Sequence, residues 1–88
     1  MAGMLGMNIE QVKGVAKEVK REAAELQSKV NNIGNKITNA EWKGPDKEKF
    51  VAEWNTHKTQ VTKCVEMLNK TASDMERNAR EQETTSGR

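Results

Sequence analysis

Hydrophobic residues recur every three or four positions over the first half of the chain. The run holds without a miss at Ile9, Val12, Ala16, Val19, Ala23, Leu26, Val30, Ile33, Ile37 and Ala40. Steps that alternate between three and four average 3.5 residues, which is the heptad period of helices that pack side by side at a shallow angle. The pattern therefore predicts one long helix over about residues 8–40.

The ends of this helix carry further signals. Asn8 suits the N-cap position, and Gln11 stands three residues later, where the partner of a capping box belongs. Toward the other end the chain is rich in asparagine and contains Gly34, which costs about 1 kcal/mol relative to alanine inside a helix. We expect the helix to continue to about Ala40, with its last two turns the place where it could fray or bend.

The helical pattern breaks at residues 41–46. Gly44 can adopt a tight-turn conformation, and Pro45 cannot continue a helix but suits the first turn of a new one. Asp46 follows, where a helix N-terminus favours negative charge. The break predicts a turn at residues 41–46 and a second helix over about residues 46–80.

The second helix carries two neighbouring hydrophobic stripes. One comprises Val51, Trp54, Val61, Val65, Leu68, Ala72, Met75 and Ala79, with Lys58 as its single miss. The other comprises Phe50, Trp54, His57, Val61, Cys64, Leu68 and Met75, and is interrupted at Thr71. Two stripes make a face wider than one neighbouring helix can cover, so we expect a second neighbour. Another copy of the chain is the most economical one, although a related hairpin would satisfy the same physics.

The fold class that follows is all-α, an antiparallel two-helix hairpin that pairs with a second hairpin as a four-helix bundle. We assign the core of the hairpin and dimer to twelve residues, which are Val12, Val19, Leu26, Val30, Ile33, Ile37, Phe50, Trp54, Val61, Val65, Leu68 and Met75. His57 is expected to pack partly buried on the same face. Cys64 is expected to act as a small buried hydrophobe, with a disulfide across a dimer axis as the alternative.

Composition supports a chain that completes its core on a partner. The 88 residues are 34% apolar, include three aromatics and no tyrosine, and have a mean hydropathy of −0.92. So small and polar a chain seldom folds alone without a disulfide, a metal or oligomerisation. A single cysteine and a single histidine exclude an internal disulfide and a His/Cys metal cluster, and no cofactor is expected.

Charge and the two ends of the chain narrow the class further. A net charge of +2 with interspersed signs is too small for a charge-driven nucleic-acid binder, and no apolar run is long enough to span a membrane. Residues 1–7 lack the charge and apolar run of a secretory signal peptide and are expected to form a flexible lead. Residues 81–88 are expected to form a disordered polar tail. No convergent polar cluster points to an enzyme.

The turn carries a motif as well as a break. Trp42 and Gly44 form a W-x-G between two heptad-patterned helices, within the run EWKGPDKEKFVAEW. Over about residues 8–80 the chain resembles the WXG100 family, the ESAT-6-like small proteins of Gram-positive bacteria and mycobacteria. Two interpretations of Trp42 stay open. It can pack as a plug at the end of the bundle, or it can serve as a recognition residue at the apex of the hairpin. Both can hold.

The resemblance implies a function that periodicity does not show. Members of the family form homodimers or heterodimers of helical hairpins, are made in the cytoplasm and are secreted by the type VII (ESX) system without a cleaved signal peptide. Some act outside the cell in virulence or protein–protein interaction. The resemblance therefore implies a non-enzymatic protein that dimerises and shows Trp42 and Gly44 to the type VII secretion ATPase.

One departure from the family pattern leaves two functions open. Many exported members carry Tyr-x-x-x-Asp/Glu just after the second helix, whereas this chain has no tyrosine. The nearest analogue is Arg77-x-x-x-Glu81, with arginine at the tyrosine position. Either this segment is a variant C-terminal signal, or a partner chain supplies the signal. In the second case the protein is an intracellular adaptor or chaperone that heterodimerises with a toxin or a related WXG partner and targets it for export.

Overall fold

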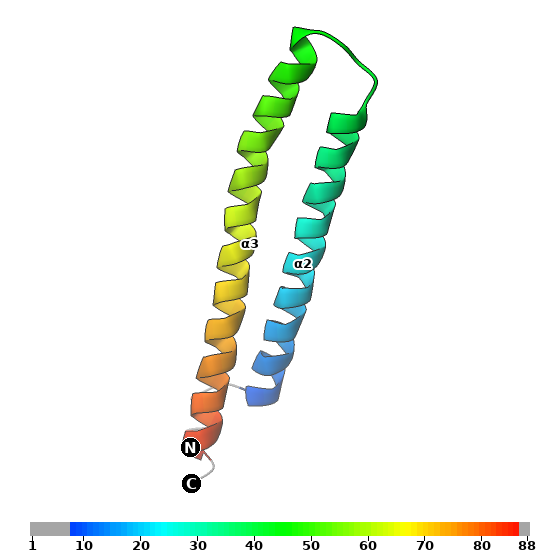
Figure 1. Cartoon of the computed structure of the whole chain (residues 1–88). Coiled ribbons are helices and arrows are strands. Elements are labelled where there is room, and N and C mark those ends of the chain that lie inside the picture. The colour runs from blue at the N-terminus through cyan, green and yellow to red at the C-terminus, as the bar shows by residue number, and fades with distance from the viewer. Residues whose placement is uncertain (1–7, 87–88) are drawn as a thin grey trace.

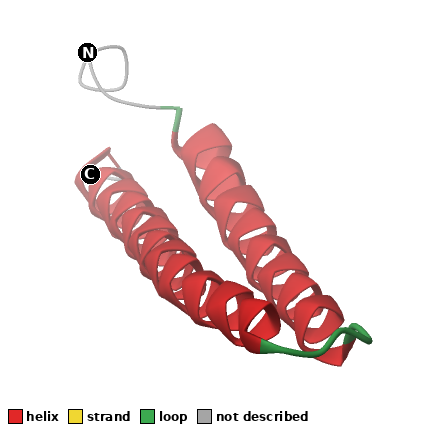
Figure 2. Cartoon of the chain, turned by 90° about the horizontal axis from the view of Figure 1, so that it is seen from above, coloured by secondary structure: helices red, strands yellow, loops and turns green. Residues whose placement is uncertain are grey.

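The computed structural model describes residues 8–86 and consists, over that range, of two long helices and no strand. Helix α2 spans Ile9–Asn39 and helix α3 spans Pro45–Ser86. They run antiparallel and side by side, joined by a short loop (Figures 1 and 2). The structure measures 67 × 16 × 15 Å, and its radius of gyration is 19.8 Å. A compact domain of this length would have a radius of gyration of about 12 Å. The predicted helical hairpin is confirmed, and it is a rod.

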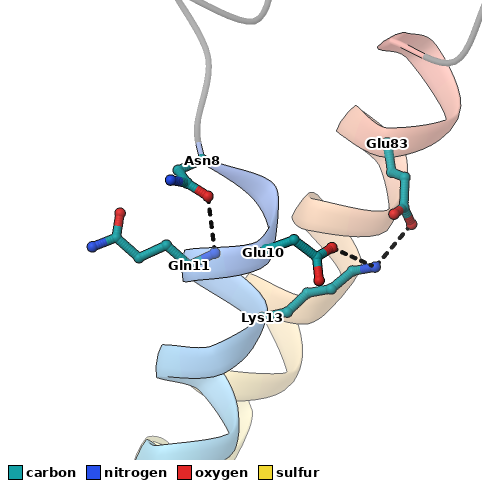
Figure 3. Close-up of polar contacts among 5 residues, drawn as sticks. All are labelled: Asn8, Glu10, Gln11, Lys13 and Glu83. Carbon is teal, nitrogen blue, oxygen red and sulfur yellow. Dashed lines mark hydrogen bonds and ion pairs between the residues drawn. The ribbon is translucent and has the colours of Figure 1, made fainter.

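The first helix begins where the cap residue predicts. The side-chain oxygen of Asn8 accepts a hydrogen bond from the backbone N–H of Gln11 at 3.0 Å (Figure 3). This bond satisfies one of the N–H groups that a helix start leaves without a partner. The backbone N–H of Val12 donates to the Asn8 carbonyl at 2.9 Å, which completes the first turn. The Gln11 side chain points away from the cap, so the cap uses Asn8 alone (Figure 3).

Glycine and proline shape the turn as their chemistry predicts. Gly44 has a φ of 105°, a conformation that residues with a Cβ rarely adopt. Pro45 is the first residue of α3, where its missing N–H costs nothing. Lys47 donates its backbone N–H to the Gly44 carbonyl at 3.2 Å and its side chain to the Ala40 carbonyl at 3.3 Å. The loop is thereby tied to both helices.

Small residues line the seam between the helices. The buried hydrophobic residues among those described are Ala16, Ala23 and Val30 on α2 and Val65, Ala72 and Ala79 on α3. Each set is spaced by seven residues, one heptad, so each forms a straight line along its helix. An alanine side chain extends one carbon beyond the backbone, so this seam lets the helices lie close together. It also leaves the larger hydrophobic side chains outside the buried core.

Two ion pairs hold the helices in register at the end far from the turn. The Lys13 amine lies 2.9 Å from the Glu83 carboxylate, and the Lys20 amine lies 2.6 Å from that of Glu76 (Figure 3 shows the first). The two lysines and the two glutamates are each seven residues apart. A slip of one residue would break both pairs and shift the alanine seam.

The stretch around Gly34, where fraying or bending could be expected, is regular helix to Asn39. A Cβ built on Gly34 would lie 2.8 Å from Nε1 of Trp54, so the missing side chain makes room for the Trp54 indole. That Nε1 atom is buried and finds no hydrogen-bond partner among the described residues. Gly34 therefore makes room for the Trp54 indole, and this packing offsets the weak helix propensity of glycine.

The second helix extends farther than its hydrophobic pattern. The pattern predicts an end near Arg80 and a disordered tail over residues 81–88, whereas α3 continues through Ser86. Glu81, Gln82 and Glu83 are good helix formers, and the Lys13–Glu83 pair ties this turn to α2. Residues 87–88, and residues 1–7 with the flexible lead expected there, lie outside the described residues.

Candidate functional site

The hairpin has two unlike faces. A step of three residues along a helix turns about 60° to one side of the starting direction, and a step of four turns about 40° to the other. Lys20, Glu76 and Glu83 each lie four residues after a seam alanine, and Lys13 lies three before one. Because these residues pair across the seam, such positions of both helices share one side of the hairpin. The other side of the hairpin, away from the ion pairs, is formed by the positions that lie three residues after a seam residue or four residues before one.

The opposite side is apolar, and we call it the apolar face. It consists of Val12, Val19, Leu26 and Ile33 on α2 and of Trp54, Val61, Leu68 and Met75 on α3. Leu26, Ile33 and Leu68 are exposed, and the other five are half-buried. On the far side of α3, Met67 is a lone exposed hydrophobic residue at 67% of its full area. The hairpin thus concentrates its uncovered hydrophobic area on one side.

The twelve residues assigned to the core divide accordingly. Val30 and Val65 are buried in the seam of the single hairpin, and Ile37 continues the seam half-buried. Eight others form the apolar face. Phe50, expected to pack against the first helix, is instead 46% exposed and stacks on the Trp42 ring. Four of the twelve, Leu26, Ile33, Phe50 and Leu68, are exposed in the single hairpin, and the assignment of the set as a dimer core stays a prediction.

The turn end gathers the three aromatic rings. The rings of Trp42 and Phe50 stack with their centres 5.4 Å apart and their planes 11° from parallel. Beside them is an open hollow of about 500 Å³ with an almost wholly apolar lining, formed by Ile37, Trp42, Phe50, Glu53, Trp54 and His57. Trp42 is 37% exposed, so one ring face packs while part of the side chain remains accessible to a partner. Both readings of Trp42 fit this geometry.

Two side chains expected to be covered are not covered in the single hairpin. Cys64 and His57 are exposed, each lying one residue before a seam position of α3 and therefore at the outer edge of the apolar face. The sequence pattern placed them on a buried stripe because it counts both stripes of α3 as one face. Only one of the two stripes contains the residues that are buried in the alanine-lined seam.

Hydrogen bonds within the ion pairs shift the pKa of Lys13, Asp74 and Glu76. The hydrogen bond to Glu83 raises the pKa of Lys13, and the hydrogen bond from Lys20 lowers the pKa of Glu76. Near the end of α3, the hydrogen bond from Lys70 lowers the pKa of Asp74, and Arg77 at 3.1 Å adds to this lowering. These pairs lie at the surface, so each stabilises the fold only weakly.

The segment considered as a variant C-terminal signal is helical. Arg77 and Glu81 are both exposed and lie one turn apart on α3, where Arg77 pairs with Asp74. Arg77 and Glu81 also border a surface hollow with Arg80 and Thr84. Their role in export stays a prediction.

Neither helix of the described chain is long and apolar enough to cross a membrane. Over residues 8–86, no three His, Cys, Asp or Glu side chains are grouped to hold a metal ion.

Sequence reasoning missed the pairing of Gly34 with Trp54. A signal was available, since a glycine within a strongly patterned helix usually has a packing reason. It also missed that alanines, rather than the larger residues beside them, would form the seam. The strict seven-residue spacing of Ala16 and Ala23, and of Ala72 and Ala79, could have shown this.

Comparison with known families agrees with this architecture. A family model described as "WXG100: Proteins of 100 residues with WXG" matches residues 4–85, which is nearly the whole chain. No curated protein and no solved structure matches the chain.

Proposed function

The chain belongs to the WXG100 family of small helical proteins associated with type VII secretion, and on that premise we propose that it is a secreted, non-enzymatic interaction protein of this system. It is made in the cytoplasm, pairs through the apolar face with a second hairpin, and is exported without a cleaved signal peptide. Trp42 and Gly44 at the apex meet the secretion ATPase.

One observation supports the proposal that two hairpins pair. The buried hydrophobic residues of the hairpin are four alanines and two valines, while Leu26, Ile33, Phe50 and Leu68 stay exposed. Fully burying a large hydrophobic side chain contributes about 1.5–3 kcal/mol, so a surface that covers the exposed part of these four side chains adds to the stability of the fold. A second hairpin covers them in the same way as the first helix covers the seam, and the result is a four-helix bundle.

The two hairpins pair antiparallel in this proposal. The turn of one then lies beside the open end of the other, where α2 begins and α3 ends. Trp42 and Gly44 of one copy thereby come near the C-terminal turns of its partner, and the two elements form one composite export surface.

Export from the producing bacterium tests this proposal. We expect Trp42→Ala to reduce the amount of protein outside the cell several-fold, because the exposed part of the indole is lost from the recognition surface. Lys43→Ala, at the neighbouring exposed position, is the matched control and should leave export unchanged. Circular dichroism and molar mass of the purified variants show whether each still folds and pairs. Unchanged export of Trp42→Ala, and of a chain lacking residues 77–88, would reject the export-signal role.

A second candidate function is an intracellular adaptor that pairs with a toxin's helical hairpin. One observation favours it, because Arg77 stands where exported members have tyrosine, and its guanidinium is engaged with Asp74. Co-expression with genomic neighbours separates the two functions. A stable one-to-one complex with a neighbour's hairpin supports the adaptor, whereas a homodimer under the same conditions supports the first proposal.

A further inference from the structure

The first turns of α3 project past the end of α2. Helix α3 has 42 residues and α2 has 31, so α3 is the longer helix. At the turn, α3 rises beyond the end of α2 and the loop descends beside it (Figure 1). The apolar hollow lies against this projecting part. Its walls are Phe50 and Trp54 of α3, Ile37 of α2, and the Trp42 ring from the loop.

The hollow suits a segment of hydrophobic, uncharged side chains. Glu53 is the one carboxylate among its lining residues, and the rest of the lining is aliphatic, aromatic or imidazole. An aromatic lining favours methionine in particular, because the polarisable thioether makes favourable contacts with ring edges and its three rotatable bonds adapt to irregular spaces.

The chain contains such a segment ahead of α2. Residues 1–7 read MAGMLGM, with three methionines, one leucine and no charge. The heptad pattern of the hairpin does not include them, and the polar composition of the rest of the chain makes this concentration distinctive. A run of side chains of this kind is stabilised by an apolar surface on which to lie.

The segment cannot reach the hollow of its own chain. It joins the hairpin at Asn8, at the opposite end of a rod 67 Å long. Seven residues span at most about 25 Å when fully extended. In an antiparallel pair of hairpins, however, Asn8 of one copy lies at the same end as the turn of the other.

We propose that residues 1–7 of a second copy of this chain occupy the hollow formed by Ile37, Trp42, Phe50 and Trp54. This rests on the antiparallel pairing proposed above and extends it. In this arrangement the methionine and leucine side chains cover Phe50 and Trp54 in the projecting first turns of α3. The swap is reciprocal, so each dimer contains two filled hollows, one at each end of the bundle.

Disulfide trapping between two differently labelled copies tests the contact. In a Cys64→Ser background, one chain carries Leu5→Cys and the other carries Glu53→Cys at the wall of the hollow. The matched control replaces Glu53→Cys by Asn55→Cys, an exposed position two residues along the same helix that does not line the hollow. After the two chains are mixed under a mild oxidant, we expect a cross-linked dimer from the Glu53→Cys mixture, at least about fivefold more abundant than from the control.

Affinity supplies a second measurement that needs no cysteine. We expect Met4→Ser combined with Leu5→Ser to weaken dimerisation at least about tenfold, since two apolar side chains lose their cover. Met67→Ser, a methionine on the far side of α3, is the control and should leave the dissociation constant unchanged.

Light scattering on the same samples separates this inference from the pairing beneath it. A dimer that fails to cross-link at Glu53→Cys, or cross-links equally well at Asn55→Cys, overturns the contact and leaves the pairing intact. A dissociation constant that is unchanged by Met4→Ser with Leu5→Ser also overturns the contact and leaves the pairing intact. A folded monomer overturns both proposals.

Discussion

Replacing Gly34 by alanine should destabilise the protein, although helix propensity alone predicts the opposite. Inside a helix, glycine to alanine gains about 1 kcal/mol. At this position, however, the new Cβ would lie 2.8 Å from Nε1 of Trp54, closer than real Cβ contacts. Because the indole is a rigid pair of rings whose Nε1 is buried beside Gly34, relieving that contact costs about 2–3 kcal/mol, the upper part of the range for overpacked sites. The expected net effect of Gly34→Ala is a loss of about 1–2 kcal/mol.

Thermal unfolding followed by circular dichroism, at one fixed protein concentration, measures this effect. A loss of that size lowers the Tm by about 4–16 °C in a chain of this length. Gly14→Ala is the matched control on the same helix, because a Cβ at Gly14 would meet nothing within 4 Å. Gly14→Ala should raise the Tm by a few degrees.

The Trp54→Ala background provides the decisive comparison. Once the indole is gone, Gly34→Ala should stabilise the fold as Gly14→Ala does. The packing of Trp54 against Gly34 would be refuted by either of two results. Gly34→Ala could raise the Tm of the unaltered protein, or its effect could be the same with and without Trp54.

Three further changes probe the cap, the seam and the register. Asn8→Ala should lower the free energy of unfolding by about 1 kcal/mol in chemical denaturation, since the first turn of α2 loses its side-chain acceptor; an unchanged midpoint would show that water replaces the cap. Ala72→Leu should cost about 1–3 kcal/mol by forcing the helices apart, whereas Ser73→Leu at the adjacent exposed position should cost little. The hydrogen bond from Lys20 lowers the pKa of Glu76, so its contribution to stability is present above the unfolded pKa and is lost as pH falls through the folded pKa. Glu76→Gln should therefore show a smaller drop in Tm than the unaltered protein between about pH 7 and about pH 3; equal drops would mean that the pair contributes nothing.

Much of the fold could be predicted from the sequence because the hydrophobic period and the turn residues point to the same answer. The heptad steps set two helices, Gly44 and Pro45 set the turn between them, and Asn8 sets the start of the first. These signals are local, so each acts within a few residues of where it is read. The end of the second helix was harder to predict, because its last turns contact Lys13, which is seventy residues away in the sequence.

The division of the hydrophobic residues between the seam and the apolar face could not be predicted from period alone. A stripe of mixed alanines and larger residues has two edges, and the helix can turn either edge toward its neighbour. The structure shows which edge is used, because the ion pairs of Lys13 and Lys20 with α3 lie on one side of the alanine seam and the larger hydrophobic residues lie on the other. The same rotation exposes Leu68 and leaves Cys64 and His57 at the rim, where the sequence pattern had placed them inside.

Molar mass in solution tests the central claim, that the hairpin pairs through its apolar face, most directly. Light scattering should give about 20 kDa, twice the 9.9 kDa of one chain, for the unaltered protein. Leu68→Glu places a charge on the apolar face and should shift the mass toward 10 kDa, while Met67→Glu, on the side of α3 that faces away from α2, should remain at about 20 kDa. A fully helical unaltered protein at 10 kDa, or a Leu68→Glu variant that remains dimeric, would contradict the account.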